Sequence, residues 1–228
     1  MMTAPLLQTL FPNIDDWSEL GQACIDTLLM LGGSLALTVA IGLPLGVLLY
    51  LTSKGQLRAM PKLYGITALV VNILRSIPFI ILMIVLMPVT YFLVGTKLGI
   101  RGAIPPLVIG AAPFFARLVE TSLREVQQGV IEASQAMGAS TWQIVRHVLL
   151  PEARAGIVSG VTVTAIALVA YTAMGGAIGA GGLGDLAYRY GYLSYKSDYM
   201  VVTVVLLIVL VQILQMIGDR LVARLTRH

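Results

Sequence analysis

Three polar residues interrupt an otherwise apolar segment, residues 63–94, and their chemistry needs an explanation. Asn72 lies three residues before Arg75 and four before Ser76, so the three side chains share one face of a helix. A charge in apolar surroundings is costly and usually faces protein or a water-filled cavity. We therefore expect this face to border a passage or a buried partner. The alternative is that Arg75 only binds backbone carbonyls freed by Pro78.

A second candidate pair ends another apolar segment, residues 155–174. Met174 follows Tyr171 by three residues and directly precedes a glycine-rich run. Methionine is flexible and polarizable, so its side chain can close a narrow apolar passage and move aside. We predict a gate at Met174. A methionine packed in the core at a helix end is the alternative.

Motifs for catalysis or for binding nucleotides and metals are missing from this sequence. A Gly-x-x-x-x-Gly-Lys-Ser/Thr phosphate loop does not occur. Gly179, Gly181 and Gly184 do spell G-x-G-x-x-G, but no strand is expected before them, so we interpret this run as a link that allows close packing or hinge motion, or as a tight turn. Cys24 is the single cysteine, which excludes a thiolate cluster. We predict no catalytic residue, metal site or cofactor in this chain.

The longest polar interval between apolar segments contains residues 132–151, EASQAMGASTWQIVRHVLLP. The pattern predicts two short helices. Glu132 is expected near the N-terminal end of the first, where the helix dipole favours an acid. Gly138 is expected to end that helix in the left-handed conformation.

The second helix of this interval has signals at both ends. Ser140 and Gln143 have the spacing of a capping box, in which each side chain accepts a hydrogen bond from the other residue's backbone N–H. Pro151 is expected to end the helix after Leu150, because proline lacks an N–H and clashes with the preceding turn. Trp142, inside this helix, is interpreted as an anchor for a partner or for lipid headgroups.

Composition places the chain in a membrane. Of its 228 residues, 57% are hydrophobic and 11% are charged, whereas soluble domains carry about 25% charged residues. The formal net charge is +4, but the bases form short clusters beside apolar segments, as orientation signals do. The sequence therefore predicts an all-α membrane protein and argues against a nucleic-acid partner.

Five apolar segments are candidates to cross a bilayer, which takes roughly 20 residues. The second is too long for a straight helix, and we expect kinks at Pro78 and Pro88. The third has only about 15 apolar residues and crosses only if it continues past Arg117; a re-entrant segment is the alternative. The expected spans are residues 27–51, 63–94, 102–123, 155–174 and 199–217.

The distribution of bases predicts the orientation. Arg and Lys gather in residues 52–62, in residues 124–154 and in the tail after residue 217, and all three intervals lie on one side if the five spans are real. This side is the cytoplasm. The N-terminus is then outside, the C-terminus is cytoplasmic, and residues 1–228 form a single transmembrane domain with a cytoplasmic loop at 124–154.

One charged pair lies near the end of the third span. Glu120 and Arg124 are spaced i, i+4, and Arg117 is near enough to join them. We expect a surface pair of small energetic value.

The loop 124–154 resembles the signature loop of permease subunits of ATP-binding-cassette (ABC) importers. That signature contains Glu-Ala-Ala, a later glycine, and an aliphatic residue followed by any residue and Leu-Pro. Here Ser134 replaces the second alanine and Val148 replaces the usual isoleucine, while the spacing from glycine to proline is kept. The resemblance implies a coupling helix that docks on an ATPase. The residues that it implies for coupling are Glu132, Ala133, Ser134, Gly138, Trp142, Leu150 and Pro151.

Three further stretches are similar to methionine-import permeases: KLYGITALVVNILRSIPFIIL at 62–82, GAAPFFARLVE at 110–120 and YTAMGGAIGAGGLGDLAYRYGY at 171–192. This resemblance implies a five-span type I importer core in the bacterial inner membrane, surrounded by lipid. It implies a second copy of the chain, two copies of a cytoplasmic ATPase that bind ATP and Mg²⁺, and a periplasmic or lipid-anchored methionine-binding protein. The expected translocation pathway then includes Asn72, Arg75, Ser76, Tyr171 and Met174.

Two alternatives stay open. The same machinery could import another small amino acid or an osmolyte. A secondary transporter driven by an ion gradient is the alternative from a different class, but the spans have no central acid and no two halves match, as that class often requires.

Overall fold

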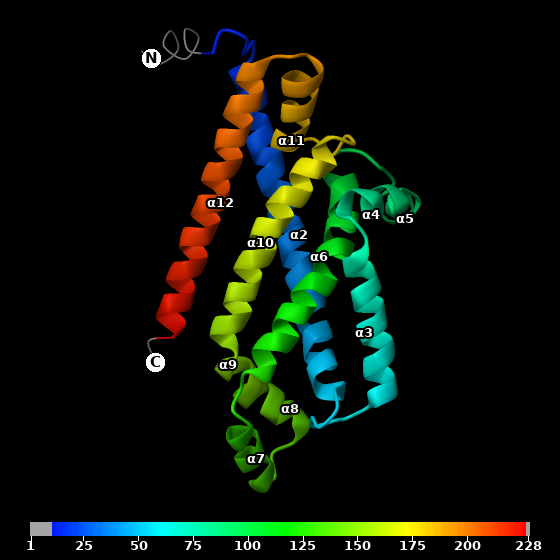
Figure 1. Cartoon of the computed structure of the whole chain (residues 1–228), viewed down its shortest axis with the longest axis vertical. Coiled ribbons are helices and arrows are strands. Elements are labelled where there is room, and N and C mark those ends of the chain that lie inside the picture. Colours follow the sequence, from blue (N-terminus) through cyan, green and yellow to red (C-terminus); the bar gives the residue numbers. More distant parts are fainter. Residues whose placement is uncertain (1–10, 227–228) are drawn as a thin grey trace. The chain divides into compact units, whose positions relative to one another are not determined.

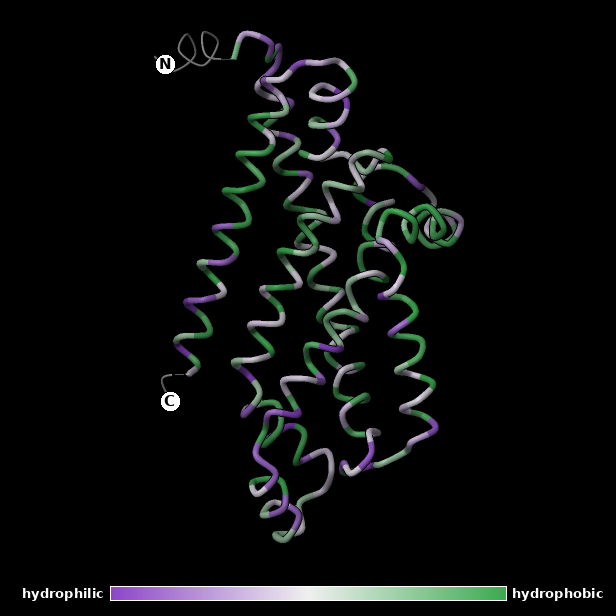
Figure 2. The backbone as a smooth tube through the Cα atoms, viewed as in Figure 1, coloured by the Kyte–Doolittle hydropathy of each residue, from purple (hydrophilic) through white to green (hydrophobic). Residues whose placement is uncertain are grey.

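A computed structural model describes residues 11–226, and all regular structure in this part of the chain is helical (Figure 1). Within residues 11–226, four helices are long and apolar enough to cross a membrane. They are α2 (Trp17–Thr52), α6 (Gly99–Arg124), α10 (Arg154–Gly176) and α12 (Ser197–Leu225). Hydrophobic residues dominate α12 along most of its length (Figure 2). The predicted all-α membrane class is confirmed.

Prolines interrupt the apolar segment at 63–94, as expected. It forms α3 (Pro61–Ser76), α4 (Phe79–Val85) and α5 (Met87–Val94). Pro78 falls in the first break, and Pro88 is at the start of α5. A proline cannot donate the backbone hydrogen bond that a continuous helix needs. Together α3 and α4 have the length and composition of a fifth span, broken or re-entrant.

The third apolar segment lies in one continuous helix. The 26 residues of α6 include Arg117, Glu120 and Arg124 near its C-terminal end. At about 1.5 Å per residue this helix is roughly 39 Å long, more than the ~30 Å of a hydrocarbon core. Its length therefore fits the expectation that the third segment continues past Arg117 and crosses the membrane, and not the re-entrant alternative.

Short helices connect the long ones. Between α6 and α10 lie α7 (Gln128–Ala136), α8 (Thr141–Ile144), the π-helix η1 (Val145–Leu149) and α9 (Leu150–Glu152). Between α10 and α12 lie α11 (Gly182–Leu186) and the π-helix η2 (Ala187–Leu193). The link that contains the glycine-rich run is thus helical over residues 182–193.

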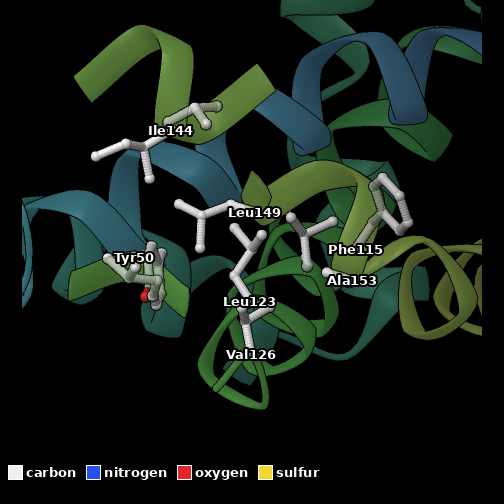
Figure 3. Close-up of a cluster of buried hydrophobic side chains, with 10 residues drawn as sticks. Tyr50, Phe115, Leu123, Val126, Ile144, Leu149 and Ala153 are labelled. Carbon is white, nitrogen blue, oxygen red and sulfur yellow. The ribbon is translucent and has the colours of Figure 1, made fainter. Parts of the chain in front are cut away.

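Two compact units are distinguished, and each has its own core. Among the described residues, unit 1 holds residues 11–34, Phe79–Leu107 and Ile166–Leu214, and unit 2 holds Leu35–Pro78, Val108–Ala165 and residues 215–226. The described core of unit 1 contains Ile14, Leu20, Ala23, Leu183, Leu186 and Tyr199. The main core of unit 2 contains Tyr50, Phe115, Val119, Leu123, Val126, Ile131, Ile144, Val145, Leu149 and Ala153 (Figure 3).

Glycines permit close backbone contacts inside both units. In unit 2, a Cβ at Gly46 would lie 2.6 Å from the Ala116 carbonyl oxygen, so α2 and α6 touch there without a side chain between them. In unit 1, a Cβ at Gly176 would lie 2.2 Å from the Asp185 backbone nitrogen. The glycine-rich run therefore allows α10 to pack closely against α11. This contact favours the interpretation as a link for close packing over that as a simple tight turn.

Candidate functional site

The turn at Gly138 joins α7 to α8 and has the hydrogen bonds of a Schellman motif. Gly138 has φ +80°, and its N–H donates to the Gln135 carbonyl at 2.9 Å. The Ala139 N–H donates to the Ser134 carbonyl at 3.1 Å. These bonds satisfy carbonyls that the end of α7 would leave unpaired. The predicted left-handed glycine is confirmed.

The start of α7 differs from the expectation. The helix begins at Gln128, so Glu132 lies in its middle, exposed, and the first turn contains no acid. The expected stabilisation of Glu132 by the helix dipole is therefore wrong, because that effect is confined to the first turn. Glu132 is instead an exposed charge on the side of α7.

The start of α8 agrees with the sequence. The Ser140 Oγ accepts from the Gln143 N–H at 3.4 Å, and the Gln143 Oε1 accepts from the Ser140 N–H at 2.8 Å. Both halves of the capping box are present. The orientation of α8, and with it that of Trp142, is thus fixed by local hydrogen bonds.

Pro151 was expected to end the second helix after Leu150, but the structure shows that it does not. The chain passes from α8 into the π-helix η1 and then into α9, which contains Pro151. The Leu150 N–H donates to the Val145 carbonyl five residues back, and the Ala153 N–H donates to the Leu149 carbonyl at 3.0 Å. The wider π-turn accommodates the proline without ending the helical path. Such π-turns are frequent at functional sites.

Buried apolar residues of this loop anchor it to the long helices of unit 2. Ile144 and Leu149 lie in one cluster with Tyr50 of α2 and Phe115 of α6 (Figure 3). Ser134 is also buried, and its hydroxyl donates to the Val130 carbonyl at 2.8 Å. The loop is therefore packed against the long helices of its unit.

The opposite side of the loop is exposed and partly apolar. Met137 is 80% exposed and Trp142 is 68% exposed. A groove of about 400 Å³ lies between α7 and α8. It is lined by Ser134, Met137, Gly138, Ala139, Gln143, Ile144, His147 and Val148. Exposed large apolar side chains beside a groove mark an interaction site. Sequence reasoning missed Met137, although a large apolar residue directly before the turn glycine was the available signal.

The other residues implied for coupling lie on both sides of the loop. Ala133 and Pro151 are exposed, whereas Leu150 is half-buried and packs against the main core of unit 2. Leu150 therefore contributes to the anchor of the loop, and the exposed pair stays available to a partner.

The polar face predicted on α3 is present. Asn72, Arg75 and Ser76 are all exposed. The Asn72 Oδ1 accepts a hydrogen bond from Arg117 at 3.0 Å, and the Ser76 hydroxyl donates to the Asn72 carbonyl at 2.7 Å. The Arg75 guanidinium lies over the ring of Phe114, 5.8 Å from its centroid. Three polar groups thus share an exposed face of an apolar helix.

The charged pair of α6 is not on the surface, so that expectation is wrong. The Glu120 side chain is only 4% exposed and accepts hydrogen bonds from Arg117 and Arg124, both at 2.7 Å. Its Oε1 also accepts from the Tyr64 hydroxyl of α3 at 3.3 Å. Burial and bonding to two guanidiniums make Glu120 the centre of a network that ties α3 to α6.

The two residues predicted near a gate differ in their surroundings. The ring of Tyr171 stacks on Phe79, with centroids 4.2 Å apart and planes 6° apart. Met174 is 46% exposed. Tyr171 is therefore held by packing inside unit 1, whereas the Met174 side chain is free to contact something outside the chain.

Comparison with known proteins assigns the family. The family described as "Binding-protein-dependent transport system inner membrane component" matches residues 42–228. The chain belongs to this family. Membership agrees with the apolar helices and confirms the inner membrane as its location.

Individual relatives within this family are named for methionine transport. The chain is 50% identical to the "Probable D-methionine transport system permease protein MetI" of Vibrio cholerae, over 94% of this chain and 97% of that one. It is 52% identical to the "Methionine import system permease protein MetP" of Bacillus subtilis, over 94% and 96%. A solved chain of the "MetNI methionine ABC transporter", in inward-facing conformations, superposes with a TM-score of 0.90 at 51% identity, over 92% and 97%. The resemblance to methionine ABC-importer permeases is confirmed.

Proposed function

We propose that this chain is the membrane-spanning permease subunit of an ATP-driven importer of methionine. The observation that carries the proposal is the 50–52% identity, over nearly the whole length, to relatives named for methionine transport. The D-enantiomer appears in the name of the Vibrio cholerae relative. The cargo is therefore D-methionine, L-methionine or both.

The partners follow from the same likeness. We infer an assembly of two copies of this chain, two cytoplasmic ATPase subunits and an external methionine-binding protein, periplasmic or lipid-anchored. The likeness to a chain of the MetNI methionine ABC transporter supports an ATPase partner. ATP and Mg²⁺ bind to that partner, and catalysis belongs to it.

In this proposal the N-terminus is outside and the loop 124–154 is cytoplasmic. The bases of residues 52–62 and of the C-terminal tail support this orientation. We assign coupling to the loop because its inner side is anchored to α2 and α6, while Trp142 is exposed and Met137 is exposed at a groove. Movement of the ATPase is passed to the long helices through this anchor.

Trp142 provides a test of the coupling surface. Replacing Trp142 with alanine is expected to weaken binding of the ATPase by about 2 kcal/mol, roughly thirtyfold in Kd, because exposed tryptophans at interfaces are frequent hot spots. Titration of purified ATPase onto the permease in nanodiscs measures the Kd. The matched control is Tyr192→Ala, an exposed aromatic of η2. Equal affinities of both variants would rule out docking through Trp142.

The pathway is assigned to the face of Asn72, Arg75 and Ser76 and to Met174 with Tyr171. Replacing Met174 with alanine is expected to raise the ATP-independent leak of methionine severalfold, because a shorter side chain closes an apolar passage less completely. Leak is measured in proteoliposomes loaded with labelled methionine. An unchanged leak together with unchanged coupling of ATP hydrolysis to uptake would show that Met174 is only a packing residue.

One reconstitution tests the whole function. The chain is co-purified with its ATPase, inserted into proteoliposomes with the external binding protein, and assayed for methionine uptake with and without ATP. Uptake that requires ATP is expected. Uptake driven by an ion gradient with this chain alone, or ATP-driven uptake of another solute in preference to methionine, would overturn the proposal.

A further inference from the structure

Arg75 places a positive charge deep in an apolar segment. It lies roughly 21 Å along the axis of α3 from Pro61, at about 1.5 Å per residue, and the hydrocarbon core of a bilayer is about 30 Å thick. The side chain is exposed on the chain's own surface. A guanidinium at this depth is costly unless it meets an anion or water.

The two arginines of the neighbouring network, unlike Arg75, are paired with a carboxylate of this chain. Arg117 and Arg124 both bind Glu120, at 2.7 Å each. Within residues 11–226, no carboxylate lies within 4.0 Å of the Arg75 guanidinium. The ring of Phe114 holds the guanidinium by a cation–π contact, which orients the group without neutralising it. Arg75 is thus a fixed cation ready for an anion from outside the chain.

Asn72 adds a second donor to this face. Its Oδ1 is engaged by Arg117 at 3.0 Å, so the amide nitrogen is the atom left to donate to another group. Ser76 donates to the Asn72 carbonyl at 2.7 Å and is not needed as a further donor. A guanidinium beside an amide N–H matches the two oxygens of a carboxylate.

We propose that Arg75, together with Asn72, binds the carboxylate of the amino acid during its passage through the permease. The guanidinium N–H groups and the Asn72 amide donate hydrogen bonds to the two carboxylate oxygens, and no covalent step occurs. This inference rests on the proposed function, because it takes an amino acid as the cargo. Every amino acid carries a carboxylate, so this contact explains how the cargo is held during transport. Selection for the methionine side chain is left to other residues.

Charge replacement at a single thiol tests the proposal. Cys24 is the only cysteine, so a Cys24→Ala background carrying Arg75→Cys has one reactive site. The assembled transporter is treated with methanethiosulfonates that add a cationic aminoethyl, a neutral methyl or an anionic sulfonatoethyl group. Losing a hydrogen bond to a charged group is expected to slow ATP-driven methionine uptake by at least about tenfold. The cationic reagent is expected to restore a large part of the rate, and the other two are not.

Controls separate this inference from the proposed function. Ile73→Cys, on an exposed apolar position of the same helix, is expected to respond equally to all three reagents. Arg75→Lys is expected to keep most of the uptake and Arg75→Gln to lose it, with assembly checked by gel filtration. Normal uptake by Arg75→Gln, or equal recovery with the neutral reagent, would overturn carboxylate binding while the wild-type importer stays active. Absence of ATP-driven methionine uptake in the wild type would instead overturn the proposed function.

Discussion

Replacing Glu120 with glutamine is expected to lower the free energy of unfolding by about 3 kcal/mol. The Glu120 carboxylate is almost fully buried and is the shared partner of Arg117 and Arg124. Removing one member of a buried ion pair costs about 3–5 kcal/mol, because a charge is left without its partner. The lower end of this range applies because the Arg124 side chain is 42% exposed and water screens it.

The loss is measured as a shift of the midpoint of thermal unfolding in detergent. A change of about 3 kcal/mol corresponds to a fall of roughly 6–12 °C for a chain of this size. Glu125→Gln is the matched control, because Glu125 is a nearby exposed carboxylate whose neutralisation is expected to cost no more than about 0.5 kcal/mol. Equal midpoints for the two variants would show that the Glu120 network contributes little to stability.

Replacing Gly138 with valine is expected to uncouple ATP hydrolysis from uptake. A Cβ at Gly138 would have no atom within 4 Å, so the substitution causes no clash. The cost is in the backbone, because φ is +80° and an L-residue in the left-handed region costs about 1–2 kcal/mol, with β-branched residues disfavoured most. A change near 1.4 kcal/mol lowers the ratio of the correct turn to other turn conformations about tenfold.

The expected result is methionine uptake reduced by up to about tenfold, while the spans fold and the ATPase stays bound. Uptake and ATP hydrolysis are measured in the same proteoliposomes, so that their ratio reports coupling. Asparagine tolerates the left-handed region better than other residues, so Gly138→Asn is the control and is expected to keep most of the uptake. Normal uptake by Gly138→Val would contradict the role given to this turn.

Features determined by neighbours in the sequence could be predicted. The turn at Gly138 and the capping box of Ser140 and Gln143 depend on residues within five positions of each other, and both are present. The helix breaks at Pro78 and Pro88 were predicted for the same reason, since a missing N–H is a property of the residue itself. The permease family was also predicted, because its signature depends on spacing.

Features determined by distant residues could not be predicted. The buried Glu120 accepts a hydrogen bond from Tyr64 of α3, and these two residues are 56 positions apart. Pro151 continues a helix because Ile144 and Leu149 are held in a core with Tyr50, which stabilises the π-turn against the usual effect of proline. In both cases tertiary packing outweighs the local preference.

The π-turn at Val145–Leu149 also fixes a rotational phase. A π-turn contains one residue more than the α-helical path that it replaces, and each residue of an α-helix turns the chain by roughly 100°. The hydrogen bond from the Ile157 N–H to the Ala153 carbonyl, at 2.9 Å, continues the helical path from α9 into α10. The direction in which Trp142 faces, relative to the start of α10, therefore depends on the extra residue of this π-turn.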